Sequence, residues 1–129
     1  MSKPLVDIMK LNKERYGTTF DFNKALDKLK EELQEFIDAE EMQDEEGKVD
    51  ALADIIVIAA GELVKLRYNP ELTLKQTVKE ISSRRQDPAQ AQRWAANNKQ
   101  PGEKWLKDIN QPKDTLYKAD YSTCKLPTN

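Results

Sequence analysis

The hydrophobic residues of this chain recur at intervals of three and four positions, which is the period of an α-helix. A first set precedes Tyr16-Gly17, where the glycine can cap a helix: Leu5, Ile8, Met9 and Leu11. Thr18 to Asp21 then indicates a turn and an N-cap. A second helix is predicted from Asn23, with one stripe towards the core: Leu26, Leu29, Leu33, Phe36 and Ile37. The charged residues 40–46 are predicted to be a connection or a frayed helix end, punctuated by Gly47.

Residues 49–66 are apolar on nearly every side of a helix. The β-branched run at 55–58 would also suit a buried strand, but the length, the alanines and the continuation through Leu63 favour a helix. A helix that is apolar all round lies at the centre of a bundle or at a subunit interface. Asn69-Pro70 is predicted to end it. Thr73 is then predicted to cap a fourth helix over 74–83, with three residues facing inward: Leu74, Val78 and Ile81.

The pattern changes after residue 85, because prolines at 88, 101, 112 and 127 interrupt the chain. Short helices are predicted over 89–97 and 103–109, carrying Trp94 and Trp105. A disordered tail seldom keeps so many aromatic residues, so we expect an irregular arm that packs on the bundle or on a partner subunit. The sequence therefore predicts a single all-α domain over 1–129, with a four-helix bundle-like core over 1–85 and an irregular arm over 86–129.

Composition adds an expectation of self-association. The 129 residues suit one domain, but 38% are hydrophobic and 34% charged, and so polar a chain often completes its core by oligomerising. We expect a homodimer or a dimer of dimers with the third helices near the centre. The net charge of −2 gives no global basic field for nucleic acid polymers or acidic membranes.

The residue inventory excludes several kinds of catalytic site. The chain has no histidine, which removes Ser–His and Cys–His pairs and histidine zinc sites. Its four glycines are scattered, so there is no P-loop. Cys124 is the single cysteine and cannot form an internal disulfide, and no hydrophobic run has membrane-spanning length, so we expect a soluble, cytoplasmic protein. Catalysis would have to rest on carboxylates, lysines, arginines and a metal.

Two acidic patches are candidates for that metal site. Glu31, Glu32 and Glu35 lie within roughly 100° of one helix face. Asp50 and Asp54 are one turn apart and interrupt the most apolar helix, where a carboxylate is costly unless its charge is compensated. Oxygen-only ligands suit Mg²⁺ or Mn²⁺, and the two patches would meet if the second and third helices pack antiparallel. Taken alone, the glutamates would suit a solvated helix face and Asp50 a first-turn residue favoured by the helix dipole.

These motifs carry a family resemblance. Glu31-Glu32-x-x-Glu35, followed by Val-Asp-Ala-Leu-Ala-Asp-Ile-Ile at 49–56 and by Gly61, resembles the all-α nucleoside triphosphate pyrophosphohydrolases. This MazG-like superfamily includes phosphoribosyl-ATP pyrophosphohydrolase and the dimeric dUTPases, and the resemblance covers roughly residues 5–85. Many members have Glu-x-x-Asp in the third helix, whereas here Ala51 stands three before Asp54 and the acid is Asp50. The Asp-Ala-Leu-Ala-Asp spacing is similar to the phosphoribosyl-ATP pyrophosphohydrolase branch.

The resemblance implies an activity and roles for the acids. The family hydrolyses nucleotides between the α and β phosphates, with Mg²⁺ offsetting the phosphate charge. Glu32, Glu35 and Asp54 would bind the metal directly, with Asp50 in the altered fourth place. Glu31 would bind a second metal or orient the attacking water.

Basic residues are expected to hold the remaining phosphate charge. Arg84 and Arg85 follow the fourth helix, where the family often carries substrate contacts, and arginine suits phosphate binding; Lys79 is a further candidate. Ordinary solvated charges at a helix end would look the same. The leading hypothesis is therefore an NTP pyrophosphohydrolase, with phosphoribosyl-ATP pyrophosphohydrolase as the alternative enzyme. A non-catalytic helical interaction module is the alternative outside enzymes, and it would be indifferent to metal.

Overall fold

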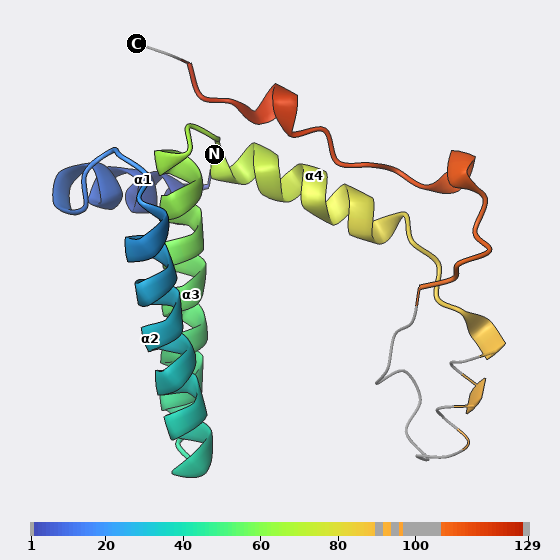
Figure 1. The fold of residues 1–129 in the computed structure, drawn as a ribbon, viewed down its shortest axis with the longest axis horizontal. Coiled ribbons are helices and arrows are strands. Elements are labelled where there is room, and N and C mark those ends of the chain that lie inside the picture. Colours follow the sequence, from blue (N-terminus) through green and yellow to red (C-terminus); the bar gives the residue numbers. More distant parts are fainter. Residues whose placement is uncertain (1, 90–91, 94–95, 97–106, 128–129) are drawn as a thin grey trace. The chain divides into compact units, whose positions relative to one another are not determined.

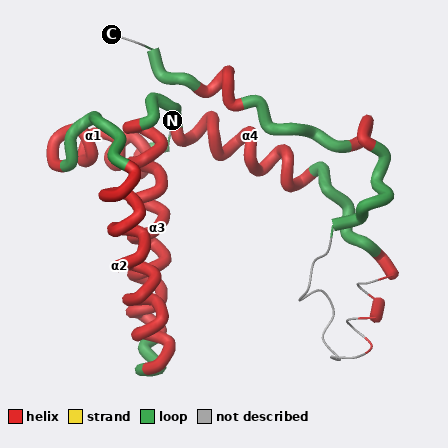
Figure 2. Tube along the Cα trace, viewed as in Figure 1, coloured by secondary structure: helices red, strands yellow, loops and turns green. Residues whose placement is uncertain are grey.

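The chain folds into helices joined by short turns and extended segments (Figure 1). The computed structural model describes residues 2–89, 92–93, 96 and 107–127. Within these ranges there is no β-strand, only isolated bridges, and the predicted all-α class is confirmed (Figure 2). No helix in the described part has both the length and the apolar character needed to cross a bilayer. The chain divides into a first unit, Met1–Thr73 with Ser122–Asn129, and a second unit, Leu74–Tyr121.

A helical hairpin forms the centre of the first unit. Helices α2 (Phe22–Glu41) and α3 (Glu45–Lys65) run antiparallel and pack side by side along their length (Figure 1). Small residues are buried on both helices of the hairpin: Ala25 and Ala39 on α2, and Ala51 and Ala60 on α3. Helix α1 (Lys3–Arg15) packs against α3. The antiparallel arrangement that would bring the two acidic patches together is therefore present.

The α2–α3 turn differs from its sequence prediction. Asp21 caps α2 as expected, accepting from the Lys24 amide at 3.1 Å. However, Gly47 does not punctuate the connection, because it lies in the first turn of α3, where its amide donates to the Asp44 side chain at 3.0 Å. Helix α3 thus begins at Glu45, one turn before the predicted start. The reversal occurs instead at Gln43, which has a left-handed φ of 56°.

The hairpin leaves apolar side chains uncovered. On α2, Leu33 and Ile37 are 51% and 48% exposed, although both belong to the stripe predicted to face the core. On α3, Leu52 and Ile56 are 48% and 62% exposed. Each pair is spaced one helical turn apart, so both helices present apolar surface that the other described residues of the first unit leave exposed.

Helix α4 (Pro70–Ser82) begins earlier than predicted. Asn69 is its cap, since the Asn69 Oδ1 accepts from the amides of Glu71 and Leu72 at 2.9 and 3.1 Å. The prediction that Thr73 caps this helix was wrong, because Thr73 is buried inside the first turn. The inward orientation predicted for three residues was also wrong: Leu74, Val78 and Ile81 are 46%, 59% and 52% exposed.

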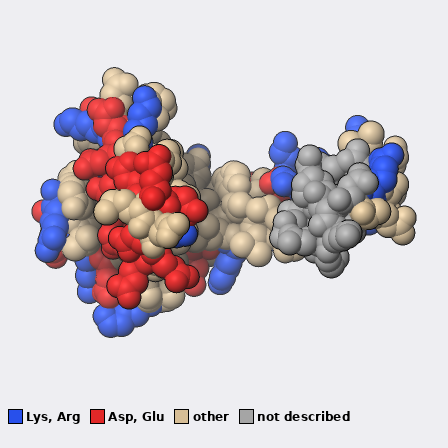
Figure 3. All heavy atoms as spheres, turned by 90° about the horizontal axis from the view of Figure 1, so that it is seen from below, with Lys and Arg blue, Asp and Glu red and all other residues tan. Residues whose placement is uncertain are grey.

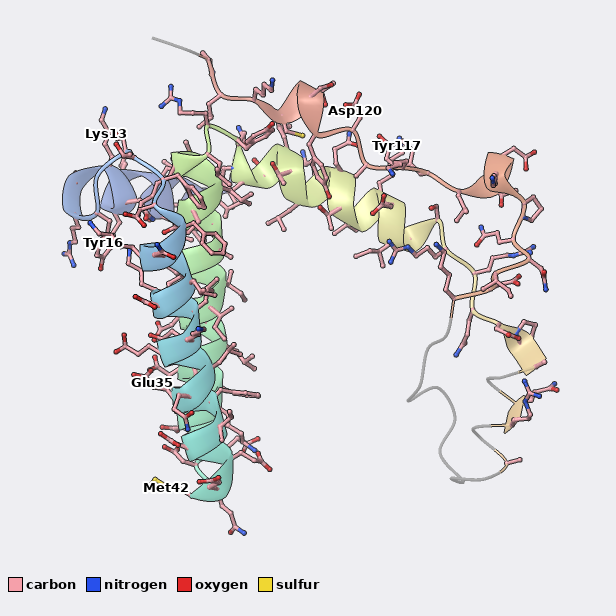
Figure 4. The ribbon with its side chains drawn as sticks, viewed as in Figure 1. Lys13, Tyr16, Glu35, Met42, Tyr117 and Asp120 are labelled. Atoms are coloured by element: carbon pink, nitrogen blue, oxygen red, sulfur yellow. The ribbon has the colours of Figure 1, made fainter. Side chains whose placement is uncertain are left out.

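The described part of the arm is held by hydrogen bonds. In the second unit, the Tyr117 amide donates to Ser83 Oγ at 2.9 Å, and the Tyr117 hydroxyl donates to Gln76. Tyr117 and Asp120 lie on the extended segment between the 3₁₀ turns Lys113–Thr115 and Tyr121–Cys124 (Figure 4). In the first unit, the amides of Asn69 and Leu126 pair with Cys124 and Arg67 at 2.7 and 2.8 Å.

Parts of the predicted arm lie outside the described residues. These include Trp94, Trp105 and most of the helix expected over 103–109; of the one expected over 89–97, Ala89, Gln92, Arg93 and Ala96 are helical. The single-domain organisation and the division at residue 85 stay predictions.

Candidate active site

Three carboxylates from the two helices of the hairpin come together. Glu32 and Glu35 on α2 and Asp54 on α3 each offer an oxygen, and these atoms lie within 4.8 Å of one another. Glu35 is exposed and lies between the two ends of α2 (Figure 4), whereas Glu32 and Asp54 are half-buried. Seen along the hairpin from one end, acidic side chains cover much of its surface (Figure 3). Glu32, Glu35 and Asp54, called the carboxylate triad below, could hold a metal ion.

Within the triad, Glu32 has an environment that disfavours the ionised form of its carboxylate. One of its two carboxylate oxygens, Oε2, is buried and has no hydrogen-bond partner among the described residues. Burial, a hydrogen bond to Glu35, and the like charges of Glu35, Asp54 and Glu31 together raise the pKa of Glu32 to about 7, and burial is the largest of these causes. A cation between these oxygens would remove both the unsatisfied atom and the repulsion. The donor set is oxygen only, which fits a hard divalent cation.

A cavity of about 410 Å³ adjoins the triad. Its wall contains Glu31, Glu32 and Asp54, but not Asp50. It also contains residues that sequence reasoning missed: Asn12, Tyr16, Lys28 and Glu62. Lys28 lies one turn before Glu32 on the same helix, so its spacing was a usable signal, whereas Asn12 and Tyr16 reach the cavity only through the packing of α1.

The remaining predicted site residues are placed as follows. Asp50 is exposed and lies outside the triad, so its role as a fourth ligand stays a prediction. Arg84 and Arg85 belong to the second unit and pair with Glu80 at 3.4 Å and Asp108 at 2.9 Å. Lys79, also in the second unit, stacks over the Tyr117 ring at 4.1 Å from its centroid. Their substrate contacts stay predictions too.

The close approach of α1 to α3 depends on Gly61. A Cβ atom at this position would overlap the amide group of Asn12. Asn12 is 6% exposed, and its Nδ2 donates to the Ile8 carbonyl at 2.9 Å. Gly61 therefore places the Asn12 side chain in the wall of the cavity.

Comparison with known proteins decides the family. The family model of phosphoribosyl-ATP pyrophosphohydrolase matches residues 9–85, more than half of the chain. The chain belongs to the phosphoribosyl-ATP pyrophosphohydrolase family. The search of curated proteins and the search of solved structures each found no match.

Family membership relates the carboxylate triad to a known class of enzymes. The phosphoribosyl-ATP pyrophosphohydrolase family is part of the MazG-like superfamily, so the chain belongs to a group of nucleotide pyrophosphohydrolases. The matched segment includes α2 and α3 and hence every predicted carboxylate ligand, together with Lys79, Arg84 and Arg85. The arm beyond residue 85 lies outside the match.

Proposed function

We propose that this phosphoribosyl-ATP pyrophosphohydrolase family member hydrolyses a nucleoside or deoxynucleoside triphosphate between its α and β phosphates, releasing the monophosphate and pyrophosphate. The observation that carries the proposal is the carboxylate triad, in which oxygens from two helices lie within 4.8 Å and one buried oxygen of Glu32 finds no partner in the described part of the chain. Mg²⁺ is the proposed cofactor, with Mn²⁺ as a substitute, since both prefer oxygen ligands.

The acidic residues have two proposed roles, which are to hold the cation and to orient the attacking water. Glu32, Glu35 and Asp54 would hold it, with Asp50 as the fourth ligand. When bound, the cation offsets the negative charge of the triphosphate and polarises the phosphoryl group. Glu31 lies in the cavity wall beside the triad and would orient the attacking water or bind a second cation. Glu31 and Glu35 are the proposed catalytic residues, Glu35 through the cation that it would hold.

Positive charge is needed to complete the phosphate site. Lys28 shares the cavity wall with the acids and can offset phosphate charge there. Arg84, Arg85 and Lys79 are proposed as further substrate contacts. The two arginines would exchange their present partners, Glu80 and Asp108, for phosphate oxygens.

Phosphoribosyl-ATP is the second candidate substrate, and the family match favours it. The cleaved bond and the roles of the acids would be the same. The spacing of Asp50 and Asp54 also fits this branch, as the sequence indicates.

We also propose that the chain acts as a homodimer or a dimer of dimers in the cytoplasm. The support is the uncovered apolar surface of the hairpin, where Ile56 on α3 is 62% exposed and Leu33 on α2 is 51% exposed. Burying such surface against a second copy would contribute about 25 cal/mol per Å².

Pyrophosphate release from a panel of nucleotides tests the activity. The panel contains ribo- and deoxyribonucleoside triphosphates and phosphoribosyl-ATP, each with Mg²⁺ and with EDTA. We expect Mg²⁺-dependent release of pyrophosphate that Glu35→Gln abolishes and that the exposed, matched control Glu41→Gln on the same helix retains. A folded protein that releases no pyrophosphate from any nucleotide would support the non-catalytic interaction module instead.

A further inference from the structure

A second cavity, of about 380 Å³, lies beside the turn between α1 and α2. Its wall carries the ammonium side chains of Lys24, Lys28 and Lys65, together with Tyr16, Thr18 and Thr19. Lys28 and Tyr16 also line the 410 Å³ cavity that adjoins the carboxylate triad, so the two cavities share a wall. This second space is called the lysine cavity below.

The lysine cavity has more positive than negative charge. Lys65 Nζ is 3.2 Å and Lys28 Nζ is 4.0 Å from the same oxygen, Glu62 Oε1. Both ammonium groups also lie against the Tyr16 ring, at 4.7 Å for Lys28 and 6.0 Å for Lys65. The wall of the lysine cavity thus carries three lysines and one carboxylate, Asp21, while Glu62 outside this wall pairs with two of the lysines.

Two of the ammonium groups, those of Lys28 and Lys65, share a single carboxylate, so their mutual repulsion is only partly offset. The Lys65 side chain is only 7% exposed and that of Glu62 only 12%. Burial, followed by the charge of Lys65, lowers the pKa of Lys28. A bound anion would offset the like-charge repulsion, and ammonium groups and threonine hydroxyls are suitable donors to phosphate oxygens.

The Lys65 end of the lysine cavity lies away from the triad. Lys65 stands eleven residues beyond Asp54 on α3, which corresponds to about 16 Å along the helix axis. A phosphate held by Lys65 is therefore remote from the group that the triad would process. The shared wall at Lys28 allows one extended ligand to occupy both cavities.

We propose that the lysine cavity is a phosphate subsite, separate from the carboxylate triad, that binds a phosphate monoester or a free phosphate ion through Lys24, Lys28 and Lys65. A phosphate monoester would be an additional phosphate group of the nucleotide substrate, at the end opposite the triphosphate, and this alternative rests on the proposed function. In the second case the subsite takes inorganic phosphate independently of hydrolysis.

The first arm of the test is phosphate binding without metal or turnover. Inorganic phosphate is titrated by calorimetry into the full chain in EDTA, comparing wild type, Lys65→Met, Lys24→Met and the control Lys30→Met. Lys30 is the control because it is exposed on α2 and lines neither cavity. Lys24 is also exposed, so Lys24→Met leaves the core intact and still tests the subsite if Lys65→Met misfolds. We expect the cavity variants to weaken binding about tenfold, as for a lost charge-assisted hydrogen bond, and Lys30→Met to bind as wild type.

The second arm measures KM for phosphoribosyl-ATP, which carries the remote phosphate, and for ATP, which does not. A rise in KM of about tenfold for phosphoribosyl-ATP alone in Lys24→Met and Lys65→Met assigns the subsite to the substrate. Phosphate binding in the first arm without that selective rise assigns it to the free ion. The subsite is overturned if there is neither phosphate binding nor a selective rise in KM. It is also overturned if KM rises equally for both nucleotides and no phosphate binds in the first arm. Absence of pyrophosphate release from either nucleotide refutes the proposed function and leaves the first arm to decide the subsite.

Discussion

Replacing Gly61 by alanine is expected to destabilise the protein, although alanine is the better helix former. Gly61 is buried within α3, and an added Cβ would overlap the amide of Asn12 on α1. Because Asn12 is 6% exposed, its side chain cannot simply turn into solvent. It would have to move against its neighbours and give up its hydrogen bond to the Ile8 carbonyl.

The opposing contributions can be compared. Alanine in place of glycine in a helix interior gains about 1 kcal/mol. Overpacking costs about 1–3 kcal/mol, and the lost hydrogen bond about 1 kcal/mol more. The net effect of Gly61→Ala is thus a loss of about 1–3 kcal/mol. In an Asn12→Ala background the overlap disappears, and the same substitution should stabilise by up to about 1 kcal/mol.

Urea unfolding of the four proteins of this double-mutant cycle, followed by circular dichroism, gives the coupling between the two positions. We expect at least about 2 kcal/mol of coupling, with the effect of Gly61→Ala changing sign between the two backgrounds. If Gly61→Ala stabilises the wild-type protein, or if the two substitutions are additive, then close packing of α1 on α3 is not what requires glycine here.

Three further predictions concern the triad, the apolar surface and the hairpin turn. Because the folded-state pKa of Glu32 is raised from 4.5 to about 7, the folded metal-free protein holds a proton that the unfolded chain releases, so its stability falls as the pH rises from about 4.5 to about 7. Thermal melts in EDTA should therefore show Glu32→Gln gaining stability over wild type more at pH 8 than at pH 5, and an equal gap at both pH values would contradict the raised pKa. Ile56→Glu should convert the proposed oligomer to monomer by light scattering, while Met42→Glu, at a 78% exposed turn position, should not; a wild-type monomer at micromolar concentration would refute the oligomer. Gln43→Gly should stabilise the protein by about 1 kcal/mol in urea unfolding, since glycine relieves the left-handed φ of 56°, and a loss of stability would show that the Gln43 side chain makes a more valuable contact.

The helices were predictable from the sequence because their apolar periods are long and regular, but some ends were not. Asp21 is of a preferred N-cap type and stands just before the helix predicted from Asn23, so its capping role could be inferred. In the charged run 40–46, Asp44 is the only residue with a preferred N-cap side chain, and it does cap α3. The start of α3 was missed because the charged run and Gly47 were interpreted as a connection. The inward orientation of Leu74, Val78 and Ile81 failed for a different reason: periodicity shows which residues share a face, not whether the chain covers that face.

The candidate site was predictable to the extent that it is local in sequence. Glu32 and Glu35 share one turn of α2, and Asp54 interrupts an apolar helix, so each could be found without the fold. The lysine cavity could not be predicted in this way. Lys28 and Lys65 stand far apart in the chain and are brought to one carboxylate only by antiparallel packing of α2 and α3.

The most direct test of the proposed function is pyrophosphate release from ATP and phosphoribosyl-ATP as Mg²⁺ is titrated, for wild type, Asp54→Asn and Asp50→Asn. We predict that Asp54→Asn lowers kcat/KM by orders of magnitude while remaining folded, and that Asp50→Asn, exposed and outside the triad, has a smaller effect. Mg²⁺-independent release, or full activity in Asp54→Asn, would contradict the assignment of the carboxylate triad as the metal-dependent active site.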